Sequence, residues 1–253
     1  MDEYGVLEGI SGNVSRTDNE DTKSFPEACV ALFRLLVARA DIVPDSDIVD
    51  IGSGCGDSTH LLSQMNPRTL RGVTSESSQA AIARRRFPNV QFIHADAVEY
   101  IASLGDDSVD RIFALDCAYH FSSRQRFLEH SARVLRRNGR IAMTDLILGE
   151  NVSLSQRLCL RLITLLTGAP YFNFKRLDDY CSEFITAGFG DVKTEDISED
   201  VFVGLQNFIH RHREDMTRFG IDGKWMAYLL FARVLRWWWD YKVVRFILVN
   251  GRI

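Results

Sequence analysis

The strongest constraint on the fold is a glycine-rich segment that follows an apolar run near residue 50. Residues 47–51 are rich in β-branched side chains, which favour a buried strand, and residues 58–65 have a helical pattern. Between them three glycines alternate, at Gly52, Gly54 and Gly56. A strand, a glycine-rich turn and a helix in this order are typical of the first unit of an open α/β sheet, whose turn offers backbone N–H groups to a ligand.

Strand and helix patterns then alternate, which predicts a parallel, doubly wound sheet covered on both faces. Four further strands are expected before residue 145, at 69–73, 90–94, 110–115 and 140–144. Helices are expected at 25–40, 77–86, 97–103 and 124–135, the last ending at Asn138-Gly139 with glycine as the C-cap. Beyond Asp145 helical segments dominate, at 151–167, 177–187, 198–218 and 224–239, with strands at 189–195 and 243–251.

The glycine pattern identifies a family resemblance. Asp50 stands two residues before Gly52, so the segment reads Asp-x-Gly-x-Gly-x-Gly and differs from the dinucleotide fingerprint G-x-G-x-x-G. It resembles motif I of the class I S-adenosylmethionine (SAM)-dependent methyltransferases. The resemblance covers residues 25–251 and is most specific over 47–145. It implies an α/β, Rossmann-like, mostly parallel sheet of seven strands in the order 3-2-1-4-5-7-6, with the last strand antiparallel.

The same resemblance predicts the domain organisation. We expect one methyltransferase domain over residues 25–253, with helical lid insertions at about 147–188 and 197–240 that form the acceptor site. Residues 1–24 are expected to form an N-terminal arm, in which Tyr4 is a candidate cofactor contact. Fraying is the competing interpretation of that arm, as at any chain terminus.

Cofactor contacts are expected where successive strands end, because ligands of such sheets bind at the carboxyl edge. By the resemblance, Gly52, Ser53, Gly54 and Gly56 form the loop around the methionine part of SAM. The carboxylate of that part would face the N-terminus of the following helix. Asp50 either orients the ammonium group or only braces the turn.

The end of the second strand departs from the common family pattern. Thr74 stands where the family usually has an acid that takes both ribose hydroxyls. Residues 72–79 instead resemble a subgroup of small-molecule methyltransferases with the pattern G-[IV]-[ST]-x-S-x-x-Q. In this interpretation Glu76, which replaces a hydroxyl residue, and Gln79 hold the ribose. The alternative is that both are solvated residues of a first helical turn.

Two further pairs of residues follow the third and fourth strands. Asp96 and Ala97 resemble the family pair that contacts adenine, although Asp96 is also a good helix N-cap. Leu115 and Asp116 stand where the family lines the pocket for the adenosine and methionine parts. Asp116 has a competing interpretation as a carboxylate that serves only its turn.

The candidate catalytic pair is His120, after the fourth strand, and Asp145, after the fifth. Neighbouring strands lie about 4.8 Å apart, so the residues that follow them can converge. We expect His120 to act as general base, with Asp145 as its orienting carboxylate. The pair resembles one in sugar O-methyltransferases with the motif A-[LI]-E-x-x-H-H, in which Tyr119 here replaces the first histidine. An ordinary packed or solvated histidine is the competing interpretation. No metal ligand set is predicted.

Composition indicates which kinds of molecule this protein is not expected to bind, such as nucleic acid and membranes. The net charge of −4 lacks the basic signature of a nucleic-acid binder, and no [DN]-P-P-[FY] follows the fourth strand. Five cysteines without C-x-x-C spacing favour reduced thiols in a cytoplasmic protein. No uncharged apolar run is long enough to insert stably into a membrane. Residues 237–239, three tryptophans, are expected to pack or to form a dimer surface, and a homodimer is left open.

We therefore expect a SAM-dependent methyltransferase that acts on oxygen or carbon of a small apolar or aromatic metabolite, with S-adenosylhomocysteine as product. One alternative is a protein that binds SAM or its demethylated product without methyl transfer. A nicotinamide-dependent oxidoreductase is opposed by the glycine spacing. The apolar insertions supply the acceptor pocket in this interpretation, although core packing would also explain many of their large residues. These residues are Leu160, Leu162, Leu165, Leu166, Tyr171, Phe172, Phe174, Phe202, Phe208, Trp225, Tyr228 and Phe231.

Overall fold

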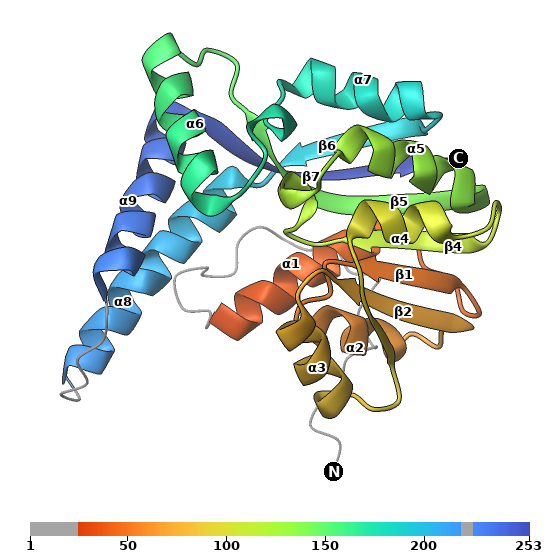
Figure 1. The fold of residues 1–253 in the computed structure, drawn as a ribbon. Helices are drawn as coiled ribbons and strands as arrows, with labels where there is room; N and C mark the ends of the chain where they lie inside the picture. The colour runs from red at the N-terminus through yellow and green to blue at the C-terminus, as the bar shows by residue number, and fades with distance from the viewer. Residues whose placement is uncertain (1–24, 219–224) are drawn as a thin grey trace.

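The computed structural model describes residues 25–218 and 225–253. The expected N-terminal arm with Tyr4, and Lys224 at the start of the last expected helix, lie outside the described residues. The described chain forms one seven-stranded sheet with helices on both faces (Figure 1).

The strands are β1 (Asp47–Ile51), β2 (Thr69–Thr74), β3 (Gln91–His94), β4 (Val109–Ala114), β5 (Leu135–Leu148), β6 (Gly190–Asp196) and β7 (Val244–Arg252). The helices are α1 (Phe25–Ala40), α2 (Asp57–Ser63), α3 (Ser77–Arg86), α4 (Ala97–Ser103), α5 (Arg124–Val134), α6 (Leu154–Thr167), α7 (Leu177–Ala187), α8 (Gly204–Arg218) and α9 (Trp225–Tyr241). Three single-turn elements are η2 (Ala118–His120), η3 (Tyr171–Asn173) and η4 (Glu199–Val203).

The strand order is β3-β2-β1-β4-β5-β7-β6, which confirms the predicted topology. Strands β1 to β5 pair in parallel, and β7 is antiparallel to both of its neighbours. The order reverses between β1 and β4, where Ile51 pairs with Ala114 at the carboxyl ends. Ligands of open α/β sheets bind at such a switch point, so the fold itself points to this edge.

Two apolar clusters hold the layers together. On one face the sheet packs against α4, α5 and α7, for example through Ile101, Phe127 and Phe184. On the other face it packs against α1, α2 and α9, for example through Leu36 and Leu62. All five residues of β1 are buried, as expected of a parallel strand that is covered on both sides.

Strand β5 differs from the sequence prediction at both of its ends. The helix expected to end at Asn138-Gly139 ends at Val134, and the positive φ of 66° belongs to Asn138, not to the glycine. The backbone of Asn138 and Gly139 instead hydrogen-bonds Ile253, the last residue of the chain. At the other end β5 continues to Leu148, because its last residues pair with the antiparallel β7.

The two insertions lie together at one end of the sheet. The segment with α6, η3 and α7 joins β5 to β6, and the segment with η4, α8 and α9 joins β6 to β7. Helices α8 and α9 pair lengthwise and project from the sheet at the left of Figure 1, with α6 above them. The rings of Phe25 in α1 and Phe208 in α8 stack 4.9 Å apart, so the second insertion returns to the domain.

The tryptophan cluster is largely internal. Trp238 is buried against Phe202, with ring centroids 5.7 Å apart, and the ammonium of Lys242 lies over Trp239. No helix in the described ranges has the length and apolarity needed to cross a membrane. All five cysteines are free thiols.

Candidate cofactor and catalytic site

The three glycines of the loop after β1 have positive φ angles but meet different surroundings. A Cβ on Gly52 would lie 2.4 Å from the Sγ of Cys117, and a Cβ on Gly56 would lie 2.7 Å from the ring of Phe92. A Cβ on Gly54 would meet nothing within 4 Å. Gly52 and Gly56 are therefore required by close packing, whereas Gly54 faces open space at the sheet edge.

Two side chains beside this loop are buried. Ser53 is 4% exposed, and its Oγ makes no hydrogen bond within the described residues. An orphaned buried hydroxyl costs free energy unless a ligand or water pairs with it. Asp50 accepts hydrogen bonds from the hydroxyls of Ser58 (2.7 Å) and Thr59 (2.6 Å), and burial raises its pKa to about 6. These bonds support the bracing interpretation of Asp50.

The end of β2 carries the two residues expected at the ribose. Glu76 is exposed, directly precedes α3, and its side chain caps no backbone group there. Gln79 lies in the first turn of α3, where its Oε1 accepts a hydrogen bond of 2.7 Å from the buried Thr74. Thr74 therefore orients Gln79, while the exposed side chain of Glu76 makes no capping bond to α3.

Asp96 and Ala97 lie at the end of β3. One carboxylate oxygen of Asp96 accepts hydrogen bonds from the backbone N–H groups of Val98 (2.8 Å) and Glu99 (3.1 Å), so the residue is the N-cap of α4. Ala97 is half-buried in the first position of that helix. The capping role leaves the second oxygen of Asp96 available at the sheet edge.

The segment after β4 is held by polar contacts. Asp116 has a positive φ of 53°, and its N–H donates to the hydroxyl of Thr144 (2.8 Å) on the neighbouring β5. Its carboxylate accepts from the phenol of Tyr119 (3.0 Å). Although one side of the residue is open to solvent, crowding by protein atoms raises the pKa of Asp116 to about 6. Leu115 beside it is half-buried against the core.

His120 ends the single turn η2, directly beyond Asp116 and Tyr119. The residue is exposed, and its imidazole lies 4.5 Å from the ring of Tyr119. Partial desolvation lowers the pKa of His120, which favours the neutral form at neutral pH. A neutral, accessible imidazole can accept a proton, as a general base must.

Asp145 lies inside β5, fully buried, and not at a strand end as expected from the sequence. Its carboxylate accepts hydrogen bonds from Arg124 (3.0 Å) and from the N–H of Leu146 (2.8 Å), and no hydrogen bond joins it to His120 within the described residues. Arg124, 1% exposed, also donates to Glu183 on α7 (3.1 Å). The pairing expected from the sequence is thus replaced by a buried ion pair that ties β5 to α5.

The sequence prediction missed Asn173, which controls the position of η2. The residue is 2% exposed in η3, and its side-chain amide donates to the backbone carbonyls of Tyr119 (3.2 Å) and Phe121 (2.8 Å). These carbonyls flank His120 on both sides. An asparagine inside an insertion gives no local signal of this role, because its partners lie more than fifty residues earlier.

The large apolar residues of the insertions divide between the core and the surface. Leu160, Phe174 and Phe202 are buried in the core, which agrees with the packing alternative. Six others have a substantially exposed surface, namely Leu162, Leu165, Leu166, Phe172, Tyr228 and Phe231.

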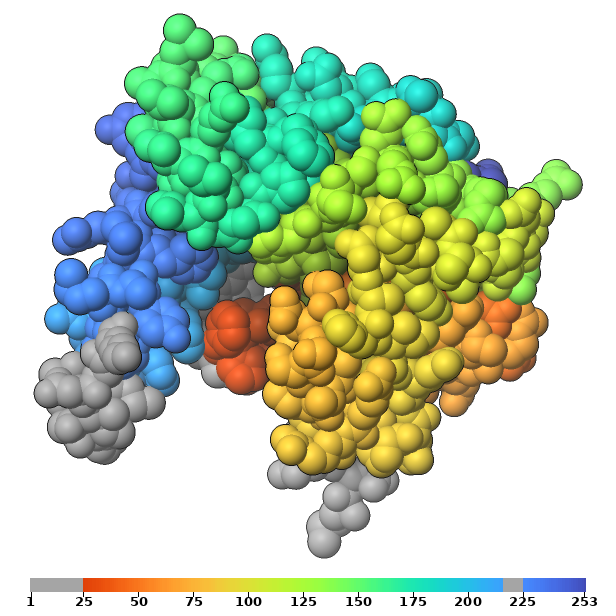
Figure 2. Space-filling view, in the orientation of Figure 1, coloured from red at the N-terminus to blue at the C-terminus, as the bar shows by residue number. Residues whose placement is uncertain are grey.

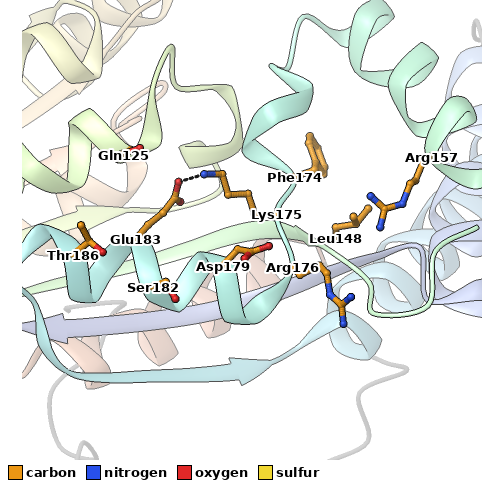
Figure 3. A pocket seen from close by; sticks show the side chains of 10 residues that line it. All are labelled: Gln125, Leu148, Arg157, Phe174, Lys175, Arg176, Asp179, Ser182, Glu183 and Thr186. Atoms are coloured by element: carbon orange, nitrogen blue, oxygen red, sulfur yellow. Dashed lines mark hydrogen bonds and ion pairs between the residues drawn. The ribbon is translucent and has the colours of Figure 1, made fainter. Parts of the chain in front are cut away.

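A groove of about 470 Å³ lies elsewhere, between α5, the end of β5, α6 and α7 (Figure 3). Charged side chains line it, and Lys175 pairs there with Glu183. None of the residues predicted for the cofactor or for catalysis lines this groove. In the described ranges no group of three or more histidine, cysteine and acidic residues is arranged to hold a metal ion.

The residues at the edge of β1, β2 and β4 have the chemistry to hold a nucleoside that carries an amino-acid group. Gly54 leaves room for a ligand against the backbone, and Ser53 lacks a polar partner within the described part of the chain. The carboxylate of Glu76 at the next strand end suits a ribose diol, since it accepts two hydrogen bonds.

Comparison with known proteins also finds similarity to methyltransferases. Residues 49–143 match the family model described as a methyltransferase domain. The chain is 28% identical over 180 residues to methyltransferase GfsG of Streptomyces halstedii, covering 68% of this chain and 63% of that one. It is 25% identical over 187 residues to 27-O-demethylrifamycin SV methyltransferase of Amycolatopsis mediterranei, covering 72% and 67%.

The fold is also that of solved methyltransferases. A Haemonchus contortus phosphoethanolamine N-methyltransferase, solved with S-adenosylhomocysteine, aligns with a TM-score of 0.75 and 17% identity over 90% of this chain and 52% of that one. In sequence and in fold, the chain is thus similar to the class I SAM-dependent methyltransferases. The chain spans somewhat less than two thirds of the length of GfsG.

Proposed function

We propose that this protein transfers the methyl group of SAM to an oxygen or carbon atom of a small apolar or aromatic metabolite. The observation that carries the proposal is the open backbone at Gly54 beside the unpartnered Ser53, one strand away from the segment that bears His120. Bound SAM would supply a methyl group on a sulfonium, which needs only an aligned nucleophile in a dry site.

Each predicted contact has a role in this proposal. The loop Gly52–Gly56 holds the methionine part, with the hydroxyl of Ser53 as a polar contact. Glu76 and Gln79 hold the ribose, and Thr74 orients the glutamine. Asp50 supports the loop from beneath and, through its remaining oxygen, attracts the ammonium group.

The adenine end is assigned to the neighbouring residues. Asp96 uses one oxygen as N-cap and offers the other to the adenine amine, and Ala97 contacts the ring. Leu115 and Asp116 line the passage towards the reacting centre. The tyrosine and threonine bonds of Asp116 fix its turn for this purpose.

His120 is the proposed general base. Its lowered pKa keeps the imidazole neutral, so it can take the proton of a hydroxyl or an acidic carbon, and its exposure allows that proton to pass to water. We assign Asp145 a structural role, because its carboxylate already binds Arg124 and so holds α5 against β5.

An apolar acceptor is supported by what surrounds this edge. Tyr119, whose ring contacts His120, and Tyr171 are half-buried against the core, and α8 reaches the start of α1 through Phe208 and Phe25. A hydroxyl acceptor agrees with the name of the Amycolatopsis relative, 27-O-demethylrifamycin SV methyltransferase, which describes an O-demethylated substrate.

Cofactor binding is tested by calorimetry with SAM and S-adenosylhomocysteine on Gly54→Val. Gly168 is a matched control, because it also has a positive φ and open space where a Cβ would lie, yet it ends α6. We expect Gly54→Val to weaken binding by at least tenfold and Gly168→Val to leave it unchanged. Equal affinities in all three proteins would refute the assignment of the loop.

Transfer is tested with methyl-labelled SAM and a panel of phenols, polyketides and isoprenoid alcohols. The proposal expects label in at least one of them, a large loss of turnover in His120→Ala with cofactor affinity retained, and no loss in the control His210→Ala, which changes an exposed histidine on α8. Tight SAM binding without transfer to any compound class would favour the alternative of a non-methylating SAM-binding protein.

A further inference from the structure

Helix α6 presents a row of leucines to solvent. Leu154, Leu158, Leu162 and Leu166 are 86%, 63%, 56% and 86% exposed, and they follow one another at intervals of four residues. Residues at this spacing form a single ridge along a helix. Figure 2 shows α6, in green, at the upper left corner of the molecule with one side uncovered.

The exposure of this leucine ridge does not come from a loosely held helix. Leu160 and Thr164 on the opposite side are buried, and Ser153 with Gln156 forms a capping box at the N-terminus. Both charged residues of the helix turn back to their own chain: Arg157 donates to the carbonyl of Val152, and Arg161 lies over the ring of Tyr171. The ridge is therefore apolar along its whole length.

We propose that α6 packs against α6 of a second copy of this chain about a two-fold axis. Interdigitation of ridges spaced by four residues is the commonest class of helix packing in globular proteins. A two-fold interface must also be self-complementary. The ridge meets this condition, since reversing its direction exchanges Leu154 with Leu166 and Leu158 with Leu162.

The extent of the surface suits such a pair. Five leucines, with Leu165 beside the ridge, contribute about 500 Å² at roughly 100 Å² for each side chain. The exposed Phe172 lies just beyond the helix and adds to this area. A stable interface buries about 800 Å² on each partner, so the leucines supply its apolar centre and neighbouring residues its rim. A bilayer surface is the less suitable occupant, because helix α6 carries only two cations, Arg157 and Arg161, and Arg157 bonds back to the carbonyl of Val152.

Pairing would also brace the catalytic edge. Helix α6 leads directly through Gly168 to η3, which carries Asn173, and Asn173 holds both carbonyls next to His120. A second copy packed on α6 would hold this helix in place and, through it, the position of η3.

The test uses sedimentation velocity of the full chain between 1 and 100 µM (on the order of the concentrations at which weak dimers form). We expect the wild type to dimerise, and Leu158→Lys and Leu162→Glu each to be monomeric with unchanged circular dichroism. Because residue 158 of one copy faces residue 162 of the other, a mixture of the two variants should dimerise again. Ile185→Glu, at an exposed isoleucine of α7, should behave as the wild type.

A wild-type monomer over this range would overturn the proposal. Failure of the mixed variants to associate would overturn the two-fold geometry, and wild-type monomers that co-sediment with phosphatidylcholine vesicles would assign the ridge to a lipid surface instead. None of these readouts depends on methyl transfer.

Discussion

Replacing Asp50 by asparagine is expected to change the pH dependence of stability in a defined direction. The carboxyl is fully buried, and burial raises its pKa from an ordinary value of 3.8 to about 6, against the lowering effect of its bonds from Thr59 and Ser58. The unfolded chain therefore loses this proton at lower pH than the folded protein does. Between about pH 4 and pH 6 the folded state becomes relatively less stable as the pH rises.

The size of the effect follows from the shift. A shift of two pKa units lowers the unfolding free energy of the wild type by about 3 kcal/mol. This loss is absent below pH 4 and complete above pH 6. Asparagine has no charge to desolvate, and its amide oxygen can accept the same two hydroxyl bonds. The unfolding free energy of Asp50→Asn minus that of the wild type should thus rise by up to about 3 kcal/mol from pH 4 to pH 7.

The assay is urea denaturation of both cofactor-free proteins at pH 4, 5, 6 and 7, followed by tryptophan fluorescence. Asp116 also has a raised pKa, but its contribution is the same in both proteins and cancels in the difference. A difference that stays constant across the four pH values would refute the reasoning, because it would mean that Asp50 titrates alike in the folded and unfolded states.

Three further predictions concern the segments around this edge. Arg124→Met leaves the buried Asp145 without its cation and should cost about 3–5 kcal/mol of unfolding free energy in urea titrations, with partial recovery when Asp145→Asn is added. Asn173→Ala removes both bonds to the carbonyls beside His120 and should cost about 1–3 kcal/mol. It should also move the pKa of His120 measured by NMR, which a comparable loss of stability elsewhere should not, for example Ile101→Val in the core at a cost of about 0.5–1.5 kcal/mol. With an identified acceptor, kcat/KM should fall as the pH drops through a His120 pKa below 6.5, and His120→Gln should abolish that limb.

Local signals explain which elements could be predicted from the sequence. The bounds of α1, α3, α4 and α7 match the prediction, because apolar periodicity and end signals lie within the helices themselves. The error at β5 has a non-local cause. Its start at Leu135 depends on pairing with Val109 and on the bonds of Asn138 and Gly139 with Ile253, far along the chain.

The same distinction holds in the site. The glycine loop and the N-cap at Asp96 follow from neighbouring residues and could be placed in advance. The partner of Asp145 could not be predicted, because a carboxylate after a predicted strand gives no indication that it pairs with Arg124 on a helix. Asn173 could not be found for the same reason.

The glycine motif itself carries two kinds of information. Gly52 and Gly56 are required because Cys117 and Phe92 occupy the space of a side chain, so these two positions report the packing of the first strand, turn and helix. Such packing would be needed in this sheet with or without a ligand. Within this loop, only Gly54 combines a positive φ with empty space, so only there does our proposal need the absence of a side chain for a bound molecule. The motif therefore reports the fold through Gly52 and Gly56, whereas its prediction of a cofactor depends on Gly54.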